Sequence, residues 1–432
     1  MNIHEIYQKV IGANYQISID TRTLQKGDVF FALTGDNFDG HEYIQQALNA
    51  GASSIIIDNE IYSSDKYTIL VSNVLEVFQD LAHYHRMQFD IPVIGLTGSN
   101  GKTTTKELMA LVLGSMKSVV ATQGNFNNHI GVPLTLFRIR LNTEIAIIEM
   151  GANHVGEIKI LCEIAAPNFG IITNIGRAHI GLFGGFENII RGKTELYRYI
   201  EAHQGQLFVH SDNQILLNNK GNTQKRTYST VDTEANTLVT IKKHSPFVSV
   251  GWKGVSVQSN LTGIYNIDNI AAAIAVGEYF MISDKNIKTA IESYIPTNER
   301  SEIVKTKKGN TIIKDYYNAN TSSMLLALEN LAEIETTQKK IAILGDMFEM
   351  GKYSQQDHTD VLEKALSCEF DDIYLAGKDF LEVSMGYISV TVFDSTDGLL
   401  SELKNRDFED SLVLIKASQG MKFKKIFEDV DW

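Results

Sequence analysis

The sequence predicts an α/β protein with three domains: a small α/β domain at residues 1–88, a central domain with a parallel sheet and a phosphate loop at 89–295, and a Rossmann-like domain at 296–432. Three observations favour this class. The chain has 432 residues, which is long for a single hydrophobic core. Short apolar strands alternate with helices along most of its length. Polar clusters follow several strands directly, as they do at the carboxyl edge of a parallel sheet.

The first domain is predicted from short strands and helices joined by polar loops. Gly27–Leu33 indicates a turn that leads into a strand, and Ser54–Ile57 indicates a second strand. Helices are expected over Glu42–Ala50 and Leu75–Met87. Four charged side chains in the polar loops serve equally well, on pattern alone, as turn residues or as binding residues: Asp20, Arg22, Asp39 and His41.

The central domain opens with a strand, a glycine-rich loop and a helix. An apolar strand at Ile91–Ile94 precedes the loop Gly95–Glu107, and apolar residues recur at helical spacing between Lys106 and Val119. This order is the context that a phosphate-binding loop requires, and it disfavours an incidental glycine-rich turn. A strict Walker sequence has glycine at position 96, where this chain has Leu96.

The loop carries the residue types that phosphate binding needs. Gly98 and Gly101 let the backbone turn tightly, so that amide groups and a helix N-terminus converge on phosphate oxygens. Lys102 is expected to neutralise the terminal phosphates, and Thr103 is expected to place a hydroxyl on Mg²⁺.

Other polar residues follow later strands of the central domain. Glu149 ends an apolar strand, where a carboxylate beside a phosphate loop can bind Mg²⁺, and His179 follows the next strand. Alone, such a glutamate is more often a surface residue and such a histidine is more often structural. Asn266 and Asn269 precede a helix of small residues, Ile270–Val276, at a point where a helix start can meet a ligand.

The C-terminal domain is expected to begin near Pro296 and to continue the strand–helix alternation. Two of its strands end in polar clusters, Asp315–Asn320 and Gly345–Gly351, at the edge where doubly wound sheets bind ligands. A Rossmann-type domain that closes over a nucleotide is therefore predicted. Its strands are expected at Asn310–Lys314, Lys340–Leu344, Asp372–Ala376, Val390–Phe393 and Ser411–Lys416.

Composition limits the classes of function. Hydrophobic residues make up 44% of the chain and charged residues 21%, as in ordinary globular proteins. A net charge of −13 makes nucleic acid an improbable partner, because binding it needs a basic surface. Anionic substrates are therefore expected to bind local cations, such as Lys102, Arg300 and Mg²⁺. Cys162 and Cys368 are too few for a disulfide framework. The N-terminus lacks a signal pattern and no apolar run fits a bilayer, so a cytoplasmic protein without membrane insertion is expected.

Several segments together resemble the Mur ligase family, in all three domains from Asp20 to about Met421. Asn318-Ala319-Asn320 stands where family members that add a single amino acid carry an Ala-His pair, so the chain is more similar to those that add a dipeptide. The segments that carry the resemblance are Asp315–Asn320 with Ser323-Met324, Leu344–Met347 with Glu349 and Gly351, Thr122–Asn125 with Asn127, Asn128 and Ile130-Gly131, and Glu149–Asn153.

The resemblance implies an ATP-dependent ligase that joins D-alanyl-D-alanine to UDP-N-acetylmuramoyl-tripeptide through an acyl phosphate. Such a ligase acts in peptidoglycan synthesis, and so in cell wall biogenesis, cell shape and cell division. It also implies ATP, two Mg²⁺ ions, a carbamylated Lys193 and a monomer. Whether the third residue of the acceptor peptide is lysine or a diamino diacid stays open.

The resemblance also implies roles for single residues. The nucleotide is assigned to Gly98, Ser99, Asn100, Gly101, Lys102, Thr103, Thr104, Asn266, Asn269, Arg300 and Asp315. The metal ions are assigned to Thr103, Glu149, His179 and Lys193, and catalysis to Lys102, Lys193, His179 and Asn128. The sugar-peptide substrate is assigned to Asp20, Thr21, Arg22, Asp39, His41, Asn127 and Asn128, and the dipeptide to Asn318, Asn320, Asp346 and Glu349.

The chain departs from the family pattern at four positions. Thr21 and Tyr316 replace a usual serine, Gly192 an alanine and Thr321 a proline; Thr21 keeps the hydroxyl, and the role of Tyr316 is left open. Two alternatives are weighed. A folylpolyglutamate synthetase of the same superfamily is disfavoured by the N-terminal domain. An ATP-binding scaffold without ligase chemistry is disfavoured because the expected phosphate and metal ligands are all present.

Overall fold

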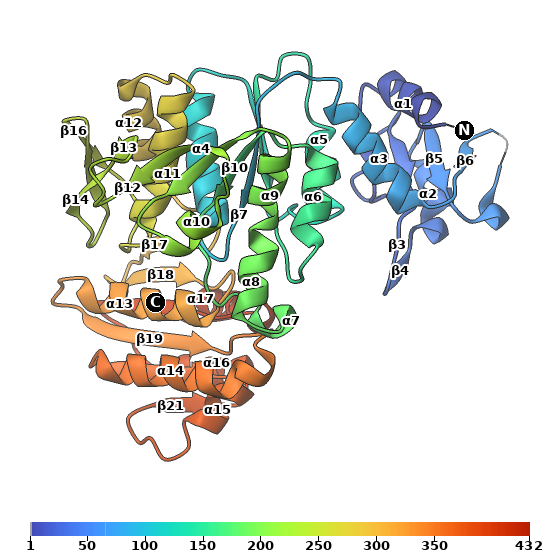
Figure 1. Ribbon diagram of the computed structural model, residues 1–432. Coiled ribbons are helices and arrows are strands. Elements are labelled where there is room, and N and C mark those ends of the chain that lie inside the picture. Colours follow the sequence, from blue (N-terminus) through green and yellow to red (C-terminus); the bar gives the residue numbers. More distant parts are fainter. Residues whose placement is uncertain (1, 65) are drawn as a thin grey trace.

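The computed structural model describes residues 2–64 and 66–432. It contains three α/β units, which Figure 1 shows in blue, in cyan to yellow, and in orange to red. Each of the three has its own sheet with parallel strands, so the predicted three-domain α/β fold is confirmed. In the described part of the chain, no helix combines the length and the apolar character that crossing a bilayer requires.

The N-terminal domain has a parallel sheet in the order β1-β2-β5-β6. Its last helix packs on helices of the central domain and so joins the two units. The strands are β1 (Ile17–Ser18), β2 (Val29–Phe31), β5 (Ser54–Ile57) and β6 (Thr68–Leu70), with a small hairpin of β3 (Thr34–Gly35) and β4 (Phe38–Asp39). The helices are α1 (Ile3–Gly12), η1 (Gly40–Tyr43), α2 (Ile44–Asn49), η2 (Glu60–Tyr62) and α3 (Val74–Arg86).

The central domain has a seven-stranded parallel sheet in the order β13-β12-β11-β10-β7-β9-β8. Its strands are β7 (Val93–Thr97), β8 (Val119–Ala121), β9 (Ile145–Glu149), β10 (Phe169–Ile172), β11 (Gln206–His210), β12 (Gln224–Ser229) and β13 (Thr237–Leu238). Because β7 lies between β9 and β10, the chain crosses over it, and the loop after β7 stands at a topological switch point of the sheet.

Helices cover both faces of this sheet (Figure 1). They are α4 (Lys102–Gly114), α5 (Gly131–Leu136), α6 (Glu157–Ala165), α7 (Ile180–Phe183), α8 (Phe186–Lys193), α9 (Glu195–Ala202), α10 (Gln214–Asn219), α11 (Asn266–Tyr279) and α12 (Asp284–Ser293). A small antiparallel sheet, which the sequence pattern did not predict, consists of β14 (Thr240–Lys243), β15 (Ser249–Trp252) and β16 (Val255–Gln258).

The C-terminal domain has a six-stranded sheet in the order β17-β18-β22-β19-β20-β21, in which only β17 is antiparallel to its neighbour. The strands are β17 (Glu302–Lys305), β18 (Thr311–Asp315), β19 (Lys339–Gly345), β20 (Asp372–Ala376), β21 (Thr391–Phe393) and β22 (Ser411–Lys416). The helices are α13 (Thr321–Glu333), η3 (Gly351–Tyr353), α14 (Ser354–Ser367), α15 (Lys378–Val383), α16 (Thr396–Leu403), η4 (Gln419–Met421) and α17 (Lys424–Asp429).

Several helices begin elsewhere than predicted. The helix expected over Ile270–Val276 begins earlier, so that Asn266 and Asn269 lie in its first turn and do not precede it. The helix expected from Lys106 begins at Lys102, because Gly101 has a left-handed φ of 78° that turns the loop directly into the helix. The helix expected over Glu42–Ala50 is split into η1 and α2, since Asp39 caps a tighter first turn by accepting a hydrogen bond from the amide of His41.

Candidate functional site

A cleft of about 1360 Å³ runs between the three domains. Its walls include Leu75 and Gln79 on α3, the loop after β7 and the carboxyl ends of β18 and β22. Many residues that the sequence assigned to nucleotide or substrates line it: Ser99, Asn100, Gly101, Lys102, Thr104, Asn127, Asn128, Glu149, His179, Asn266, Asn269, Arg300, Asp315, Asn318, Asn320 and Glu349.

The phosphate loop is held tightly at Gly98 and Gly101. At Gly98 the φ is 149°, and an added Cβ would collide with the hydroxyl of Thr173. At Gly101 an added Cβ would lie 2.5 Å from Asn269 Oδ1. The hydroxyl of Ser99 donates to the carbonyl of Gly176 at 2.9 Å. The loop therefore has a fixed shape. The amides of Ser99 and Asn100 donate to Asn174, so the amides at the start of α4 are the ones available to an anion.

Lys102 turns back over this loop. Its Nζ donates to the carbonyl oxygens of Gly98 at 2.8 Å and Ser99 at 3.2 Å. Burial lowers the pKa of Lys102 to about 8. The nearby carboxylate of Glu149 acts in the opposite direction and raises this pKa. An amine held in this way is ready to exchange carbonyl oxygens for phosphate oxygens, which keep it charged.

Glu149 ends β9 in a polar pocket below the loop. Its Oε1 accepts hydrogen bonds from Asn127 Nδ2 at 2.9 Å and Thr103 Oγ1 at 3.3 Å. Its Oε2 is buried and has no hydrogen-bond partner among the described residues, with Lys106 Nζ 3.6 Å away. A buried carboxylate oxygen left in this state beside a threonine hydroxyl suits a hard cation, so these residues fit Mg²⁺.

Lys193 lies behind the wall of the cleft and is 1% exposed. Its Nζ donates to the carbonyl of Ala152 at 3.0 Å, and Ala152 lines the cleft. Burial lowers the pKa of Lys193 well below its ordinary value, and the charge of Lys102 adds to this effect. The structure thus favours the neutral amine, which is the form that reacts with electrophiles.

Two asparagines of the cleft wall are fixed at the start of α11. Asn266 Nδ2 donates to the carbonyl of Thr262 at 2.8 Å, and Asn269 Nδ2 donates to Asn266 Oδ1 at 2.8 Å. Thr105 Oγ1 donates to Asn269 Oδ1 at 2.9 Å. Both side chains are therefore rigid neighbours of the phosphate loop, and their assignment to the nucleotide stays a prediction.

The C-terminal wall is organised by a buried ion pair between β18 and β22. Lys416 Nζ lies 2.6 Å from Asp315 Oδ2 and 3.3 Å from the carbonyl of Asn318, and it is 2% exposed. The guanidinium of Arg300 lies over the ring of Tyr317, 3.8 Å from its centroid. Tyr316, whose role the sequence left open, is buried in the hydrophobic core of this domain.

Asn320 and Asn318 do not occupy equivalent positions. Asn320 Oδ1 accepts from the amide of Ser323 at 3.0 Å and caps α13, while its Nδ2 donates to Asn100 Oδ1 of the phosphate loop at 2.8 Å. Asn318 is exposed to the cleft, and its Oδ1 accepts from the amide of Ala319 at 2.9 Å. Asn318 is therefore the one of the two with an amide directed to solvent, whereas Asn320 joins two domains.

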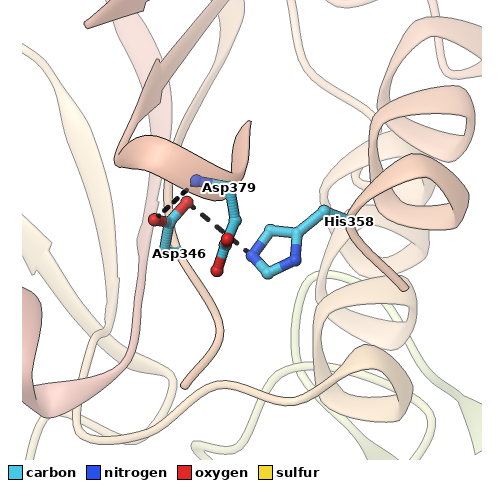
Figure 2. Close-up of side chains that lie close together, drawn as sticks. All are labelled: Asp346, His358 and Asp379. Carbon is cyan, nitrogen blue, oxygen red and sulfur yellow. Dashed lines mark hydrogen bonds and ion pairs between the residues drawn. The ribbon is translucent and has the colours of Figure 1, made fainter. Parts of the chain in front are cut away.

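Asp346 lies beside His358 and Asp379 (Figure 2) and is not among the residues that line the cleft, so its assignment to the dipeptide does not fit. Its carboxylate accepts hydrogen bonds from the amides of Phe380 at 2.9 Å and Asp379 at 3.1 Å, at the start of α15. His358 lies beside it, but its Nε2 accepts from the amide of Met347 at 3.0 Å. The side chain of Asp346 is buried within the domain because two backbone donors hold it there, so its role is structural.

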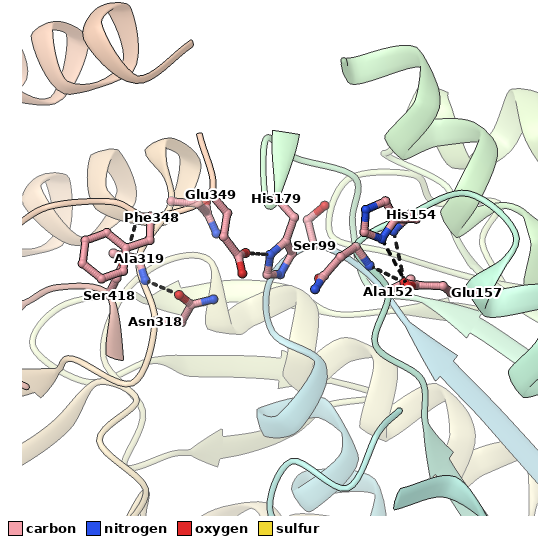
Figure 3. A network of polar contacts seen from close by, with 12 residues as sticks. Ser99, Ala152, His154, Glu157, His179, Asn318, Ala319, Phe348, Glu349 and Ser418 are labelled. Atoms are coloured by element: carbon pink, nitrogen blue, oxygen red, sulfur yellow. Dashed lines mark hydrogen bonds and ion pairs between the residues drawn. The ribbon is translucent and has the colours of Figure 1, made fainter. Parts of the chain in front are cut away.

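Glu349, three residues later, points into the cleft and contacts His179 of the central domain (Figure 3). Its Oε2 accepts a hydrogen bond from His179 Nδ1. This contact holds the pKa of Glu349 below its ordinary range. The two residues, predicted for a metal ion and for the dipeptide, are thus direct neighbours.

The charged loops of the N-terminal domain lie outside the residues that line the cleft. Asp20 and Arg22 form an exposed ion pair at 2.6 Å, and Thr21 Oγ1 donates to Gln46 at 2.7 Å. His41 is 3% exposed and lies between Asp39 at 2.6 Å and Asp58 at 3.2 Å. Direct contact of His41 with a substrate does not fit this burial, so His41 instead fixes the loop that carries Asp39.

Three residues of the site were missed by the sequence analysis. Lys106 lies near Glu149, and Lys416 lies at the centre of the C-terminal wall. Asn174 Oδ1 accepts a hydrogen bond from the amide of Asn100 at 3.0 Å. A signal existed for each lysine: Lys106 follows Lys102 by one helical turn, and Lys416 ends an apolar strand, where a charged residue needs a partner.

Family models match each of the three domains. The Mur ligase family catalytic domain matches residues 14–86, the Mur ligase middle domain matches 96–277, and the Mur ligase glutamate ligase domain matches 299–419. Together they include most of the chain and all three walls of the cleft.

Relatives and solved structures agree with these matches. The UDP-N-acetylmuramoyl-tripeptide–D-alanyl-D-alanine ligase of Bacillus subtilis is 33% identical over 96% of this chain and 92% of its own, and that of Escherichia coli is 29% identical over 95% and 92%. MurF from Acinetobacter baumannii has a TM-score of 0.87 at 28% identity, covering 96% of this chain and 93% of its own. MurF ligase from Thermotoga maritima in complex with ADP has a TM-score of 0.84 at 26% identity, covering 96% of each chain. The chain therefore belongs to the Mur ligase family.

Proposed function

We propose that this protein is the ATP-dependent ligase that joins D-alanyl-D-alanine to UDP-N-acetylmuramoyl-tripeptide, forming ADP and phosphate, in the synthesis of a peptidoglycan precursor. The observation that carries the proposal is the cleft in which a phosphate loop faces the carboxyl edge of the C-terminal sheet. Relatives that bear this activity in their names align with nearly the whole chain, which supports the choice of substrates.

The nucleotide binds at the phosphate loop. The amides of Gly101–Thr104 at the N-terminus of α4 receive the phosphates, and Lys102 exchanges its two carbonyl partners for phosphate oxygens. Asn266, Asn269, Arg300 and Asp315 complete the nucleotide site from the two facing walls.

Thr103 and Glu149 would hold one Mg²⁺ ion, and His179 and a carbamate on Lys193 would hold a second. When bound, Mg²⁺ supplies a compact positive charge that neutralises phosphate oxygens. The chain prepares Lys193 for carbamylation because burial keeps its amine neutral. The amine nitrogen forms a bond to the carbon of CO₂ and releases one proton, which leaves an anionic carbamate in place of a cation.

The ligation has two steps. The terminal carboxylate of the tripeptide takes the γ-phosphoryl group, so that an oxygen–phosphorus bond forms as the bond to ADP breaks. The amine of the dipeptide then attacks the acyl carbon, phosphate leaves, and the amine loses a proton as the amide forms. Lys102 stabilises the charge on the transferred group, and the facing domains exclude water, which would hydrolyse the acyl phosphate.

The two organic substrates approach from opposite ends of the cleft. The sugar-peptide substrate lies toward the N-terminal domain, with its uridine end near the loops of Asp20, Thr21, Arg22 and Asp39 and its peptide beside Asn127 and Asn128. The dipeptide lies at the C-terminal wall, where Asn318 offers an amide donor and acceptor. We place this reaction in the cytoplasm, where ATP is available, and expect the protein to act as a monomer.

Phosphate release tests the proposal. Purified protein with ATP and Mg²⁺ is given both substrates, each one alone, or neither, with acceptor peptides that end in lysine or in a diamino diacid. Release that needs both substrates, and a product whose mass includes the dipeptide, is expected. Release with glutamate and a folate would instead favour the folylpolyglutamate class. The absence of release with every pair would favour an ATP-binding scaffold and refute the ligase proposal.

A further inference from the structure

We propose that Glu349 is a positioning residue that fixes the imidazole of His179 across the domain interface and directs its Nε2 into the cleft. This inference rests on the proposed function, because it concerns the histidine assigned there to Mg²⁺. It replaces the expectation that Glu349 binds the dipeptide.

The contact between the two side chains is specific in its atoms. Oε2 of Glu349 meets Nδ1 of His179, and the carboxylate can only accept, so Nδ1 carries the proton. The other nitrogen, Nε2, then carries a lone pair. Among the described residues no group forms a hydrogen bond with this Nε2, and the side chain lines the cleft. A histidine held by a carboxylate in this way is the usual arrangement of a metal ligand.

The backbone of both loops adopts an uncommon conformation at the contact between Glu349 and His179. His179 and Glu349 both have left-handed φ values, 56° and 64°, which are uncommon for residues other than glycine. The amide of Gly181 donates to the carbonyl of Glu349 at 3.0 Å. An added Cβ at Gly181 would lie 2.6 Å from that carbonyl oxygen and from the amide nitrogen of Gly351. The two loops therefore dock by main chain as well as by side chain.

Glu349 and His179 belong to different domains, so the contact between them depends on how these domains are docked. The C-terminal domain supplies the carboxylate, while the central domain supplies the histidine and the phosphate loop. When the domains separate, His179 loses the group that selects its tautomer. His179 is therefore held in the tautomer that suits a metal ligand only when the C-terminal domain is docked.

A matched control exists at the same interface. Arg177 Nη2 lies 2.7 Å from Asp357 Oδ1, and this ion pair also joins the central and C-terminal domains. It does not contact His179. Asp357→Asn weakens the docking without removing the carboxylate on the imidazole, whereas Glu349→Gln removes that carboxylate and preserves the side-chain size.

The first measurement needs no metal and no substrate. In protein labelled with ¹⁵N-histidine, long-range ¹H–¹⁵N spectra report the tautomer of each ring, and His179→Gln identifies the signal. We expect the Nδ1–H tautomer of His179 in the wild type and in Asp357→Asn, and a mixture of tautomers in Glu349→Gln. An unchanged tautomer in Glu349→Gln would overturn the proposal.

The second measurement is the affinity for Mn²⁺, used as a probe and titrated with nucleotide present. We expect Glu349→Gln to bind the His179-dependent Mn²⁺ ion about 10- to 100-fold more weakly, and Glu349→Asp to recover part of the loss. An unchanged Mn²⁺ affinity with a raised KM for the dipeptide would also overturn the proposal and return Glu349 to the substrate. If both expected shifts occur in a protein that shows no ligation, the proposed function fails while this inference stands.

Discussion

His85 makes the junction between the N-terminal and central domains sensitive to pH. The residue lies on α3, is 0% exposed, and is packed against Phe137 of the central domain. Its Nδ1 accepts from the hydroxyl of Tyr7 at 2.7 Å, and its Nε2 donates to the carbonyl of Ile139 at 3.1 Å. Both nitrogens of the neutral ring thus form hydrogen bonds. A proton added to Nδ1 would break the hydrogen bond from Tyr7, or would make Nδ1 the donor and the Tyr7 hydroxyl the acceptor.

Burial lowers the pKa of His85 to about 4 from an ordinary value of 6.5, with Arg140 adding to the effect and the contact with Ile139 opposing it. Between these values the unfolded chain binds more protons at this site than the folded one, so stability rises with pH. The contribution is fully present above 6.5 and is lost as the pH falls to about 4. At about 1.4 kcal/mol for each pKa unit, the full loss is about 3 kcal/mol, and about 1.4 kcal/mol is lost by pH 5.5.

The assay compares variants, because many other groups titrate in the same range. Urea unfolding, followed by probes on the N-terminal domain, is measured between pH 7.5 and 4.5 for the wild type, His85→Gln and His83→Gln. Glutamine keeps a donor and an acceptor but does not titrate. We expect the wild type to lose about 1.4 kcal/mol more than His85→Gln between pH 7.5 and 5.5. His83, on the same helix and only partly buried, controls for the substitution itself. Parallel pH profiles for all three proteins would refute the reasoning.

Three further predictions concern the cleft. Gly181→Ala should separate the C-terminal domain, because the new Cβ would meet the carbonyl oxygen of Glu349 at 2.6 Å; X-ray scattering should show a larger radius of gyration, and an unchanged curve would contradict this. Lys193→Ala should be nearly inactive and should regain part of its turnover with added short-chain carboxylates, whereas a lack of any rescue would argue against a carbamate. Lys416→Met should destabilise the C-terminal domain by about 3–5 kcal/mol in urea unfolding, because it leaves Asp315 without its partner, and a loss below about 1 kcal/mol would contradict the importance of the pair.

The position of the site could be predicted from the sequence because it depends on strand ends. Ser54–Ile57 and Ser411–Lys416 form strands with the predicted bounds. Parallel strands of one sheet bring their carboxyl ends to one edge, so Glu149 and the phosphate loop had to share an edge of the central sheet, and Asp315 and Gly345–Gly351 an edge of the C-terminal sheet. The antiparallel sheet β14–β16 was not predicted, since its strands are short, β14 is exposed, and β16 packs against α12, which lies further along the chain.

Contacts between side chains that are far apart in the sequence could not be predicted in the same way. Lys416 and Asp315 pair across adjacent strands that are far apart in the sequence, and the hydrogen bond of Asn320 to Asn100 joins two domains. No local pattern encodes such partners. The sequence therefore placed Asn320 at the correct edge of the sheet, but it did not indicate that the amide would be used by the phosphate loop.

The loop after β19 shows what decides the role of a polar residue at such an edge. Asp346 and Glu349 were expected to act together, yet they turn in opposite directions. Two amides at the start of α15 lie within reach of Asp346, and a buried carboxylate is most stable where backbone donors meet it. Glu349 lies beyond these donors, and its left-handed backbone turns it across the cleft to His179. Among the described residues, the C-terminal domain gives donors to Asp346 but none to Glu349. The carboxylate of Glu349 is thus the one available to His179 of the central domain.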